Sequence, residues 1–556
     1  MNEESGAGDS TPTGQGGLPG TAREPWTEPG LHSVSVRGAA SVGSGLARAR
    51  AARPIRPGER IHVVGAAGAG ASAAVLLAHH AGAAVSGCDS GGPSPYTPPI
   101  VALGVSLSWS HDASHVTREP HPERLAVTKA LTAIDANNPE LEAARAASIP
   151  LEPWQQVIAD AAAERTLVAV AGTHGKSTTS GWLVHVLIAA GLDPSAFVGA
   201  LLPGSITGGL PSTARFGEGL PFVVEADEYA GNFDAYRPDV AVLTSAEWDH
   251  PDVFADSAAV VDAFVVWLER AAASVARPVL VAHVLDEGVA ASVERLQRDG
   301  WPGRLICVGV PDPTASERRA RERLDLAARF ATAGGPADVF LGYVTRVDPD
   351  GTTIALEGTA FPEPLTTRLR LAGRHNAANA LGVAGAALAL GVPASVVTSA
   401  LATFDGVGRR LERKGEGSGV VVYDDYGHHP TAIRETLAAV RQKEPGKRIW
   451  AVYEPLTFHR TAAMLEQFAD VLAGADAVAI ADIWASRDPD TSITSASALA
   501  EAVSRRRPEM PVAAPGSVEA TAAWLAGEVR PGDAVLVMGG GKSYLIAEIL
   551  VRALQG

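Results

Sequence analysis

The sequence predicts an α/β protein with three consecutive domains, each built on a mostly parallel sheet. The chain has 556 residues, and at about 100–200 residues per domain this length suggests three or so folded units. Short apolar runs typical of buried strands alternate with longer stretches typical of helices. Most of these runs end in polar or glycine-rich turns. This alternation favours parallel sheets that carry helices on their faces.

The beginning of the chain lacks such a pattern. Residues 1–57 are rich in Gly, Ser, Thr, Pro and Ala and show no sustained periodicity. A segment of this composition cannot bury enough apolar surface to offset the entropy lost on ordering. We therefore predict a disordered tail over residues 1–57.

The first domain is expected at residues 58–164. Residues 61–64 read IHVV and run into the glycine turn GAAGAGAS, a helix and a second strand that ends at Asp89. Near the end of the domain, Asn138 and Pro139 predict a helix start, because Asn caps helices and proline suits their first position. A strand, glycine turn, helix and strand in this order predict a Rossmann-like domain.

The glycine turn of the first domain suits a phosphate. Gly65, Gly68 and Gly70 free the backbone to approach a pyrophosphate. A strict G-x-G-x-x-G would need glycine at position 67, where Ala67 stands. The turn alone is weak evidence, and an NAD-type dehydrogenase is disfavoured.

The second domain is expected at residues 165–404 and opens with a phosphate-binding loop. The buried-strand run 166–170 leads into the loop GTHGKST, and a long helix begins near Lys176. Backbone N–H groups of the loop can bind phosphate, Lys176 can neutralise the terminal phosphates, and the Ser177 hydroxyl can hold Mg²⁺. The strict G-x-x-x-x-G-K-[ST] pattern would need glycine where Val170 stands, so the loop is a shorter variant. The alternative is a glycine turn with a surface lysine.

Two acidic clusters follow apolar strand candidates in this domain. One reads EADE and begins at Glu225; the other reads EWDH and ends at His250. Ligands gather at the carboxyl ends of parallel strands, so both clusters are expected beside the phosphate loop. Glu225 and His250 are candidate metal ligands for phosphoryl transfer. The alternative is a pair of solvated loops, since Asp and Glu are mostly exposed.

Further along, the sequence GRHNAAN opens an alanine-rich helix. Asn376 and Asn379 are three residues apart and share one helix face, where their amides can bind a purine or ribose. The alternative is that an asparagine caps the helix. The charged stretch at about 310–335 predicts a surface helix or insertion.

The third domain is expected at residues 405–556. Its strand candidates again end in polar or glycine-rich turns. Arg410 offers a guanidinium for phosphate, and the sequence DDYGHHP brings Asp425, His428 and His429 to a strand end. Without context, a His-His pair is usually structural or exposed.

Composition excludes several classes of protein. The formal net charge is −16, which argues against general affinity for nucleic acid because phosphate contacts need a basic surface. Cys88 and Cys307 are the two cysteines, too few for a disulfide framework or a four-cysteine metal site. No apolar run reaches the roughly 18–20 residues of a membrane helix, and no signal peptide is evident. We expect a cytoplasmic protein without membrane insertion, either a monomer or a homodimer.

Together these motifs resemble those of the Mur ligases, which build the peptide stem of peptidoglycan. GTHGKST, EADE, EWDH, GRHNAAN and DDYGHHP occur in the family's order, and the resemblance covers residues of about 60 to 556. The sequence DDYGHHPTAI is most similar to the branch that adds L-alanine to UDP-N-acetylmuramate. The resemblance implies a Rossmann-like N-terminal domain, a central P-loop ATPase-type domain and a Rossmann-like C-terminal domain. It also implies that ATP phosphorylates the muramate carboxylate and that an amine attacks the resulting acyl phosphate.

The resemblance further implies roles for individual residues. The catalytic set would be Lys176, Glu225, His250, Arg410 and Asp425. ATP would contact Gly172, Thr173, His174, Gly175, Lys176, Ser177, Thr178, Asn376 and Asn379, with Mg²⁺ on Ser177, Glu225 and His250. The UDP substrate would lie at Gly65, Gly68, Gly70, Ser72, Asp89 and Ser90, and the amino acid at His428, His429 and Arg460.

The chain also departs from the alanine-adding branch. Ala67 stands where that branch usually has glycine, and Ala71 where it has methionine. Its P-H-x-[YF]-[ST]-R stretch reads PLTFHR here, so that only Pro455, Phe458 and Arg460 match. The alternatives are a recycling ligase that joins a murein tripeptide to UDP-N-acetylmuramate, a P-loop kinase or transporter-type ATPase, and a catalytically silent UDP-sugar-binding protein.

Overall fold

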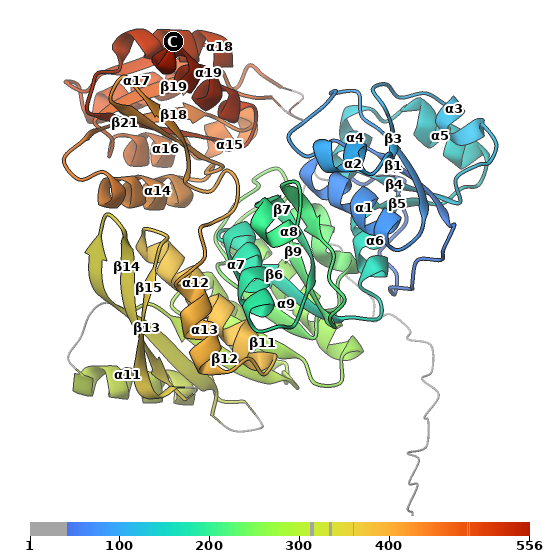
Figure 1. The fold of residues 1–556 in the computed structure, drawn as a ribbon, viewed down its shortest axis with the longest axis horizontal. Helices are drawn as coiled ribbons and strands as arrows, with labels where there is room; N and C mark the ends of the chain where they lie inside the picture. The colour runs from blue at the N-terminus through green and yellow to red at the C-terminus, as the bar shows by residue number, and fades with distance from the viewer. Residues whose placement is uncertain (1–41, 312–315, 333–335, 360, 486–487, 489) are drawn as a thin grey trace, which may run out of the picture. The chain divides into compact units, whose positions relative to one another are not determined.

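The computed structural model describes residues 42–556 except 312–315, 333–335, 360, 486–487 and 489. Its strands form three sheets of five, ten and six strands, which follow one another along the chain (Figure 1). This arrangement confirms the predicted α/β class.

The first sheet is fully parallel, in the order β3-β2-β1-β4-β5. Its strands are β1 (Arg60–Val64), β2 (Ala84–Cys88), β3 (Ser106–Ser108), β4 (Arg124–Val127) and β5 (Leu151–Pro153). Its helices are α1 (Ala69–His80), α2 (Pro98–Ala102), α3 (Ser114–Thr117), α4 (Lys129–Ile134), α5 (Pro139–Ala146) and α6 (Trp154–Ala161). The strand order reverses beside β1, so the glycine turn after β1 occupies the place where open α/β sheets bind ligands.

Residues 42–57 correct the predicted tail. Residues 1–41 of that prediction lie outside the described part of the chain. The backbone N–H of Gly43 donates to the Lys129 carbonyl, and the Arg50 guanidinium binds Glu152 and Asp160, each at 2.8 Å. Ile55 is buried in the first domain's core. Specific ion pairs with the domain, invisible in local composition, order this stretch.

The central sheet runs β15-β14-β13-β12-β11-β10-β6-β9-β7-β8. Its strands are β6 (Thr166–Ala171), β7 (Ser195–Leu202), β8 (Ser212–Arg215), β9 (Pro221–Ala226), β10 (Val240–Leu243), β11 (Val279–His283), β12 (Arg304–Gly309), β13 (Asp338–Asp348), β14 (Gly351–Gly358) and β15 (Phe361–Leu369). Its helices are α7 (Lys176–Ala189), α8 (Gly204–Thr207), η2 (Tyr229–Ala235), α9 (Ser257–Ser274), α10 (Glu287–Arg298), α11 (Ser316–Arg329), α12 (Arg374–Ala389) and α13 (Ala394–Leu401).

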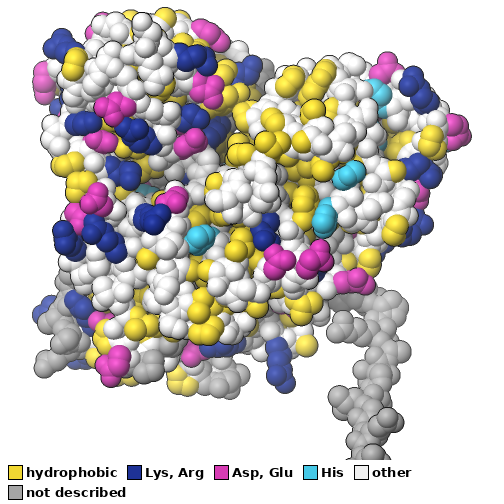
Figure 2. All heavy atoms as spheres, viewed as in Figure 1, with side chains coloured by type: hydrophobic (Ala, Val, Ile, Leu, Met, Phe, Trp, Pro, Cys, Tyr) yellow, Lys and Arg dark blue, Asp and Glu magenta, His cyan; other side chains and the backbone are white. Residues whose placement is uncertain are grey.

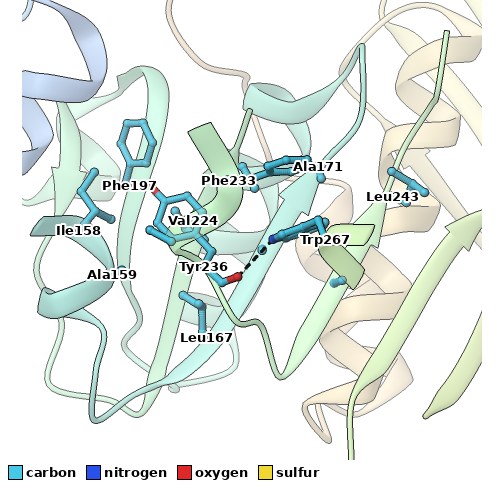
Figure 3. Close-up of a cluster of buried hydrophobic side chains, with 14 of the residues drawn as sticks. Ile158, Ala159, Leu167, Ala171, Phe197, Val224, Phe233, Tyr236, Leu243 and Trp267 are labelled. Atoms are coloured by element: carbon cyan, nitrogen blue, oxygen red, sulfur yellow. Dashed lines mark hydrogen bonds between the residues drawn. The ribbon is translucent and has the colours of Figure 1, made fainter. Parts of the chain in front are cut away.

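The two faces of the central sheet bury different helices. Val168 and Val170 of β6 belong to a buried cluster with residues of α7, α12 and α13, whereas Leu167 and Ala169 belong to another cluster with residues of α9 and α10. Figure 3 shows the cluster that contains Leu167, in which the Trp267 indole donates to the Tyr236 carbonyl at 3.1 Å. The cluster extends into the first domain through α6. The strand β6 that precedes the phosphate loop is therefore held from both sides.

The third sheet runs β16-β17-β21-β18-β19-β20, and β16 alone is antiparallel to its neighbour. Its strands are β16 (Glu412–Gly417), β17 (Val420–Asp425), β18 (Arg448–Glu454), β19 (Ala477–Ala481), β20 (Val512–Gly516) and β21 (Asp533–Gly539). Its helices are α14 (Pro430–Lys443), α15 (Phe458–Ala463), α16 (Leu465–Leu472), α17 (Ala496–Arg506), α18 (Val518–Glu528) and α19 (Ser543–Gln555). Two buried clusters lie on the two faces of this sheet.

Charged side chains of both signs are mixed on one face of the molecule (Figure 2). On the face shown in Figure 2, basic and acidic side chains are interspersed and form no continuous basic stripe. Within the described residues, no helix combines the length and the apolar character needed to cross a bilayer.

Candidate active site

The phosphate loop, residues 172–178, follows β6 and includes the first three residues of α7. Gly172 and Gly175 have φ angles of 133° and 79°, which favour glycine. A Cβ on Gly172 would collide with Thr244, and one on Gly175 with Asn379.

The Thr173 hydroxyl donates to the Glu247 carbonyl at 3.0 Å, and the His174 N–H donates to the Ser245 hydroxyl at 2.8 Å. The residues after β10 therefore brace the loop.

Lys176 lies at the start of α7 between two acids. Its ammonium donates to the Gly172 carbonyl at 2.7 Å and to Glu228 at 2.9 Å, and Asp227 lies at 3.4 Å. Burial opposes the lysine's charge, but Glu228 and Asp227 outweigh burial and raise its pKa. Burial raises the pKa of Glu228 to about 7. The structure thus excludes the alternative of a free surface lysine.

Ser177 joins residues from two domains. Its hydroxyl donates to Glu225 at 3.0 Å, and the guanidinium of Arg410 donates to the same hydroxyl at 2.8 Å. The other oxygen of Glu225 accepts from the Gly199 N–H at 2.6 Å. Arg410 also lies over the Tyr426 ring. A guanidinium of the third domain therefore reaches the phosphate loop of the second.

His250 lies close to two further acids of the first acidic cluster. Potential ligand atoms of His250, Asp227 and Glu228 all lie within 4.8 Å of one another, whereas Ser177 and Glu225 bind each other. The sequence prediction placed His250 with Ser177 and Glu225. Because β9 and β10 flank β6 on opposite sides, their terminal clusters approach the loop from two directions.

Asn376 and Asn379 lie together in the first turns of α12. The Asn376 amide donates to the Ala372 carbonyl at 2.7 Å, and the Asn379 amide donates to Asn376 at 3.2 Å. The residue that caps α12 is Gly373, without a side-chain capping bond. The alternative of an asparagine N-cap is therefore wrong, because neither amide accepts from the helix's first N–H groups.

Asp425, at the end of β17, organises the third domain's contribution. Its two oxygens accept from the backbone N–H groups of Leu411 at 2.7 Å and Gly427 at 2.6 Å. The first bond fixes the residue that follows Arg410, and the second fixes the turn that leads to His428. Asp425 is buried, so these contacts hold both segments in place.

His428 and His429 differ in their hydrogen bonds. His429 Nδ1 accepts from the Thr431 N–H at 3.3 Å, so Nε2 carries the proton and donates to the Trp248 carbonyl at 3.2 Å. His428 Nδ1 lies 2.9 Å from the Tyr426 carbonyl and must donate to it, which leaves a lone pair on Nε2.

Burial and Arg460 hold the pKa of His428 well below its usual range. Burial and His174 lower that of His429 to about 4.

Arg460 forms a buried link between the second and third domains. Its guanidinium lies 2.7 Å from Asp249 and 3.0 Å from His250 Nδ1. Both side chains of the Arg460–Asp249 pair are nearly inaccessible. Burial opposes the charge of Asp249, yet Arg460 outweighs it and holds the aspartate pKa well below its usual range. Two further guanidinium nitrogens, Nε and Nη1, have no hydrogen-bond partner in the described structure.

The predicted UDP residues separate into two groups. Gly65, with φ of 86°, Gly68 and Asp89 form the turn after β1, where Asp89 accepts from the Ala67 N–H at 3.0 Å. Ser90 is exposed beside this turn.

Ser72 instead is buried in α1 and binds the Thr213 hydroxyl of β8 at 3.0 Å. Gly70 packs on Trp154, which leaves no room for a Cβ.

A cavity of about 1320 Å³ collects most of the predicted residues. Its lining includes Gly70, Thr173, His174, Gly175, Lys176, Ser177, Thr178, Glu225, His250, Asn376, Asn379, Arg410, Asp425, His428 and His429. Sequence reasoning missed Glu228 and Asp249, which bind Lys176 and Arg460. Both belong to clusters that the sequence marked, but the contacts that single them out come from distant residues.

Two family models match this chain. The one described as "Mur ligase family, catalytic domain" matches residues 60–166, and "Mur ligase, glutamate ligase domain" matches residues 409–541. A UDP-N-acetylmuramate–L-alanine ligase from Mycobacterium sp. (strain JLS) is 36% identical over 506 residues, covering 89% of this chain and 95% of the relative. The chain belongs to the Mur ligase family.

Solved structures show the same fold as this Mur ligase. A UDP-N-acetylmuramate–alanine ligase from Thermotoga maritima matches with a TM-score of 0.68 and 22% identity, covering 89% of this chain and 98% of that one. A murein peptide ligase from Psychrobacter arcticus matches with a TM-score of 0.63 at 22% identity, with the same coverage. The two neighbours differ in the acceptor that their names give, so the fold alone does not select between those activities.

Proposed function

We propose that this Mur ligase joins L-alanine to the lactyl carboxylate of UDP-N-acetylmuramate at the expense of ATP, in peptidoglycan precursor synthesis. The observation that carries the proposal is the contact of Arg410 with Ser177, which brings the third domain onto the phosphate loop. The 36% identity to an L-alanine ligase over 89% of the chain supports this choice of substrates. A cytoplasmic location follows from the use of ATP and a nucleotide-linked sugar.

The proposed reaction begins with phosphoryl transfer from ATP to the muramate carboxylate. Loop N–H groups and Lys176 would hold the phosphates, and Arg410 would stabilise the charge that develops on the transferred group. Asn376 and Asn379 lie behind the loop, where we assign the adenine end of ATP. Transfer gives an acyl phosphate, a far better electrophile than the carboxylate.

Mg²⁺ is the metal that suits this site. Ser177 and Glu225 offer oxygen donors beside the loop, and His250 lies with Asp227 and Glu228 within ligand distance of one another. Hard oxygen ligands are those that Mg²⁺ prefers. We propose Ser177, Glu225 and His250 as metal-holding residues, with Asp227 and Glu228 as added candidates. Bound Mg²⁺ screens the phosphate charge.

The second half-reaction requires a neutral amine. We assign the acceptor of its proton to His428 Nε2, because this nitrogen keeps a free lone pair while Nδ1 donates to the Tyr426 carbonyl. Both nitrogens of His429 are engaged in hydrogen bonds, so it serves to position the chain. The two unpartnered nitrogens of Arg460 are suited to the amino acid's carboxylate.

Product analysis tests the proposal. The full chain is incubated with UDP-N-acetylmuramate, ATP and Mg²⁺ in four separate reactions. Each reaction also contains one of L-alanine, glycine, L-serine and the murein tripeptide. Mass spectrometry of the nucleotide product is expected to find the L-alanine amide, with phosphate released in equal amount. A product formed with the tripeptide and none with L-alanine would establish the recycling activity instead.

A further inference from the structure

A cluster of metal-binding side chains lies in the first domain, outside the cavity described above. His62 comes from β1, Cys88 from the end of β2, His115 from α3 and Glu140 from the first turn of α5. One potential ligand atom from each residue lies within 4.8 Å of all the others. Of the three groups of this kind among the described residues, the other two contain residues that line the candidate active site.

The separations within the cluster suit a tetrahedral ion. His62 Nε2 lies 3.7 Å from Glu140 Oε1, and the Cys88 thiol lies 3.0 Å from Glu140 Oε2. His115 Nδ1 contacts Glu140 Oε1 directly. Bonds of about 2.0–2.3 Å to a tetrahedral zinc place its ligands roughly 3.3–3.8 Å apart. The side chains need only small movements to surround one ion.

Burial distinguishes this cluster from a solvated acidic patch. The side chains of His62 and Glu140 are 3% and 0% exposed, and Cys88 is fully buried. The Nε2 atom of His62 is buried and has no hydrogen-bond partner. A buried nitrogen without a partner costs free energy unless something binds it.

The orientation of His62 is already set for metal binding. Its Nδ1 lies 2.8 Å from the Ser86 hydroxyl, and Ser86 stands opposite His62 in the register of β1 and β2. When Nδ1 donates to this hydroxyl, the lone pair lies on Nε2, which faces Glu140. Histidine ligands of metals are commonly fixed in this way through their second nitrogen.

We propose that His62, Cys88, His115 and Glu140 bind one Zn²⁺ ion in the first domain. Thiolate, imidazole and carboxylate are the ligands that zinc takes, and four protein ligands in a buried setting define a structural site. His111 lies against it, with Nδ1 3.3 Å from the Cys88 sulfur and 3.1 Å from Glu140. This site is independent of the proposed ligase activity.

Zinc at this position would connect α3 and α5 to the central strands. The backbone carbonyl of Cys88 accepts from the N–H groups of Gly65 and Ala66, both at 2.9 Å. A metal held by Cys88 therefore fixes the residue on which the glycine turn after β1 rests. The ion would stabilise the first domain and the shape of that turn.

Metal content of the full-length protein provides the first test. Wild type, Cys88→Ser, Glu140→Gln and Cys307→Ser are incubated with excess Zn²⁺, passed through a weak chelating resin, and analysed by elemental mass spectrometry. Cys307 is the matched control, because it is also a buried free cysteine but lies in β12 of the central sheet. Wild type and Cys307→Ser are expected to retain one more zinc per chain than the two site variants.

Cobalt substitution and thermal stability provide readouts that do not depend on activity. Co²⁺-loaded wild type and Cys307→Ser should show a thiolate-to-cobalt charge-transfer band that Cys88→Ser lacks. Zinc should raise the Tm of wild type and leave that of Glu140→Gln unchanged. Equal zinc retention in all four proteins, or a wild type without the band, would overturn the proposal. Because the cobalt spectrum uses wild type, it decides the question even where a variant fails to fold.

Discussion

Lys176 is the residue on which we expect phosphate binding to depend most. Its ammonium is held by Glu228 and by the Gly172 carbonyl, at the N-terminus of α7. In the proposed reaction, replacing it with alanine would remove the positive charge assigned to the transferred phosphate and would leave Glu228 and Asp227 to repel the nucleotide. We expect Lys176→Ala to lower kcat for phosphate release by at least roughly 10²–10³-fold, the scale of losing one preorganised charge-stabilising group.

A surface lysine provides the control for this experiment. Lys447 pairs with Glu444 within one turn, outside the cavity, so Lys447→Ala should keep wild-type turnover. Thermal melting of both variants checks that they fold. Unchanged phosphate release by Lys176→Ala would contradict the role given to the loop.

His429 predicts a pH dependence of stability. Its pKa is about 4 in the folded chain and about 6.5 when unfolded. As the pH falls from 6.5 towards 4, the histidine becomes protonated in the unfolded chain but stays neutral in the folded chain. Its contribution to the free energy of unfolding therefore decreases until about pH 4. The loss is roughly 3 kcal/mol at most.

The variant His429→Asn isolates this effect. Asparagine can still accept from the Thr431 N–H as the cap of α14, but it does not titrate. At pH 7 the variant should be the less stable, because it lacks the bond to Trp248. The urea midpoint of the variant minus that of wild type should then rise steadily as the pH is lowered from 7 to 4. A difference that does not change with pH would show that His429 titrates normally.

Single residues also show what local patterns can mark. Lys176, Ser177 and Glu225 were marked as candidates, because a glycine loop after a buried strand and an acid at the end of the neighbouring strand are local patterns. Glu228, Asp249 and the cluster around Glu140 were not singled out. Their importance depends on partners up to 211 residues away, as for Asp249 and Arg460, and no local pattern encodes such a pairing. The assigned roles of the predicted residues stay predictions until the variants are measured.

At the level of elements, two glycines near the start of α1 have different expected roles. One packs against another helix, and the other lies on the turn where the UDP part of the substrate is expected. Gly70 lies against Trp154 of α6, so a methyl group there would force the two helices apart. Gly68 has φ of −73°, and a Cβ on it would meet only the Gly65 carbonyl at 3.5 Å. We expect Gly70→Ala to destabilise the first domain by about 1–3 kcal/mol.

Gly68→Ala should leave stability nearly unchanged, because alanine fits the space available. If the UDP part of the substrate lies on this turn, the added methyl group should raise KM for UDP-N-acetylmuramate several-fold without changing KM for ATP. Melting curves and initial-rate kinetics of both variants check these expectations. A normal KM for both substrates in a folded Gly68→Ala variant would place the UDP elsewhere.

The elements themselves were predicted unevenly. Buried parallel strands such as β6, β9 and β10 are continuous apolar runs, which are easily recognised in the sequence. The antiparallel strands β13, β14 and β15 lie at one edge of the sheet, and no prediction was made for them. Residues 42–57 were assigned to a disordered tail because their order depends on Glu152 and Asp160, which follow about 100 residues later.

Across the whole molecule, the proposed chemistry requires the third domain to stay against the second. The polar contacts that hold it include Arg410 with Ser177, His429 with the Trp248 carbonyl, Thr431 with Glu247, Arg460 with Asp249, and the Gln442 amide with the carbonyls of Asp348 and Gly351. Of these, the Arg460–Asp249 pair is the most buried. Removing one partner of a buried ion pair typically costs about 3–5 kcal/mol, because the other charge is left uncompensated.

Asp249→Ala is therefore expected to loosen the third domain. The connector at residues 402–411 joins α13 to β16, and it should become more accessible when the domains separate. Limited proteolysis is expected to cut this connector several-fold faster in Asp249→Ala than in wild type, and kcat should fall with it. Asp262→Ala is the matched control, because Asp262 pairs with Arg295 at the surface of the central domain.

The double variant Asp249→Ala with Arg460→Ala distinguishes a lost contact from a stranded charge. If the stranded guanidinium causes the loosening, removing it as well should slow the cleavage again, towards the wild-type rate. Catalysis should not recover, since Arg460 is also assigned to the amino acid's carboxylate. Cleavage as slow in Asp249→Ala as in Asp262→Ala would mean that the remaining contacts suffice to hold the domain.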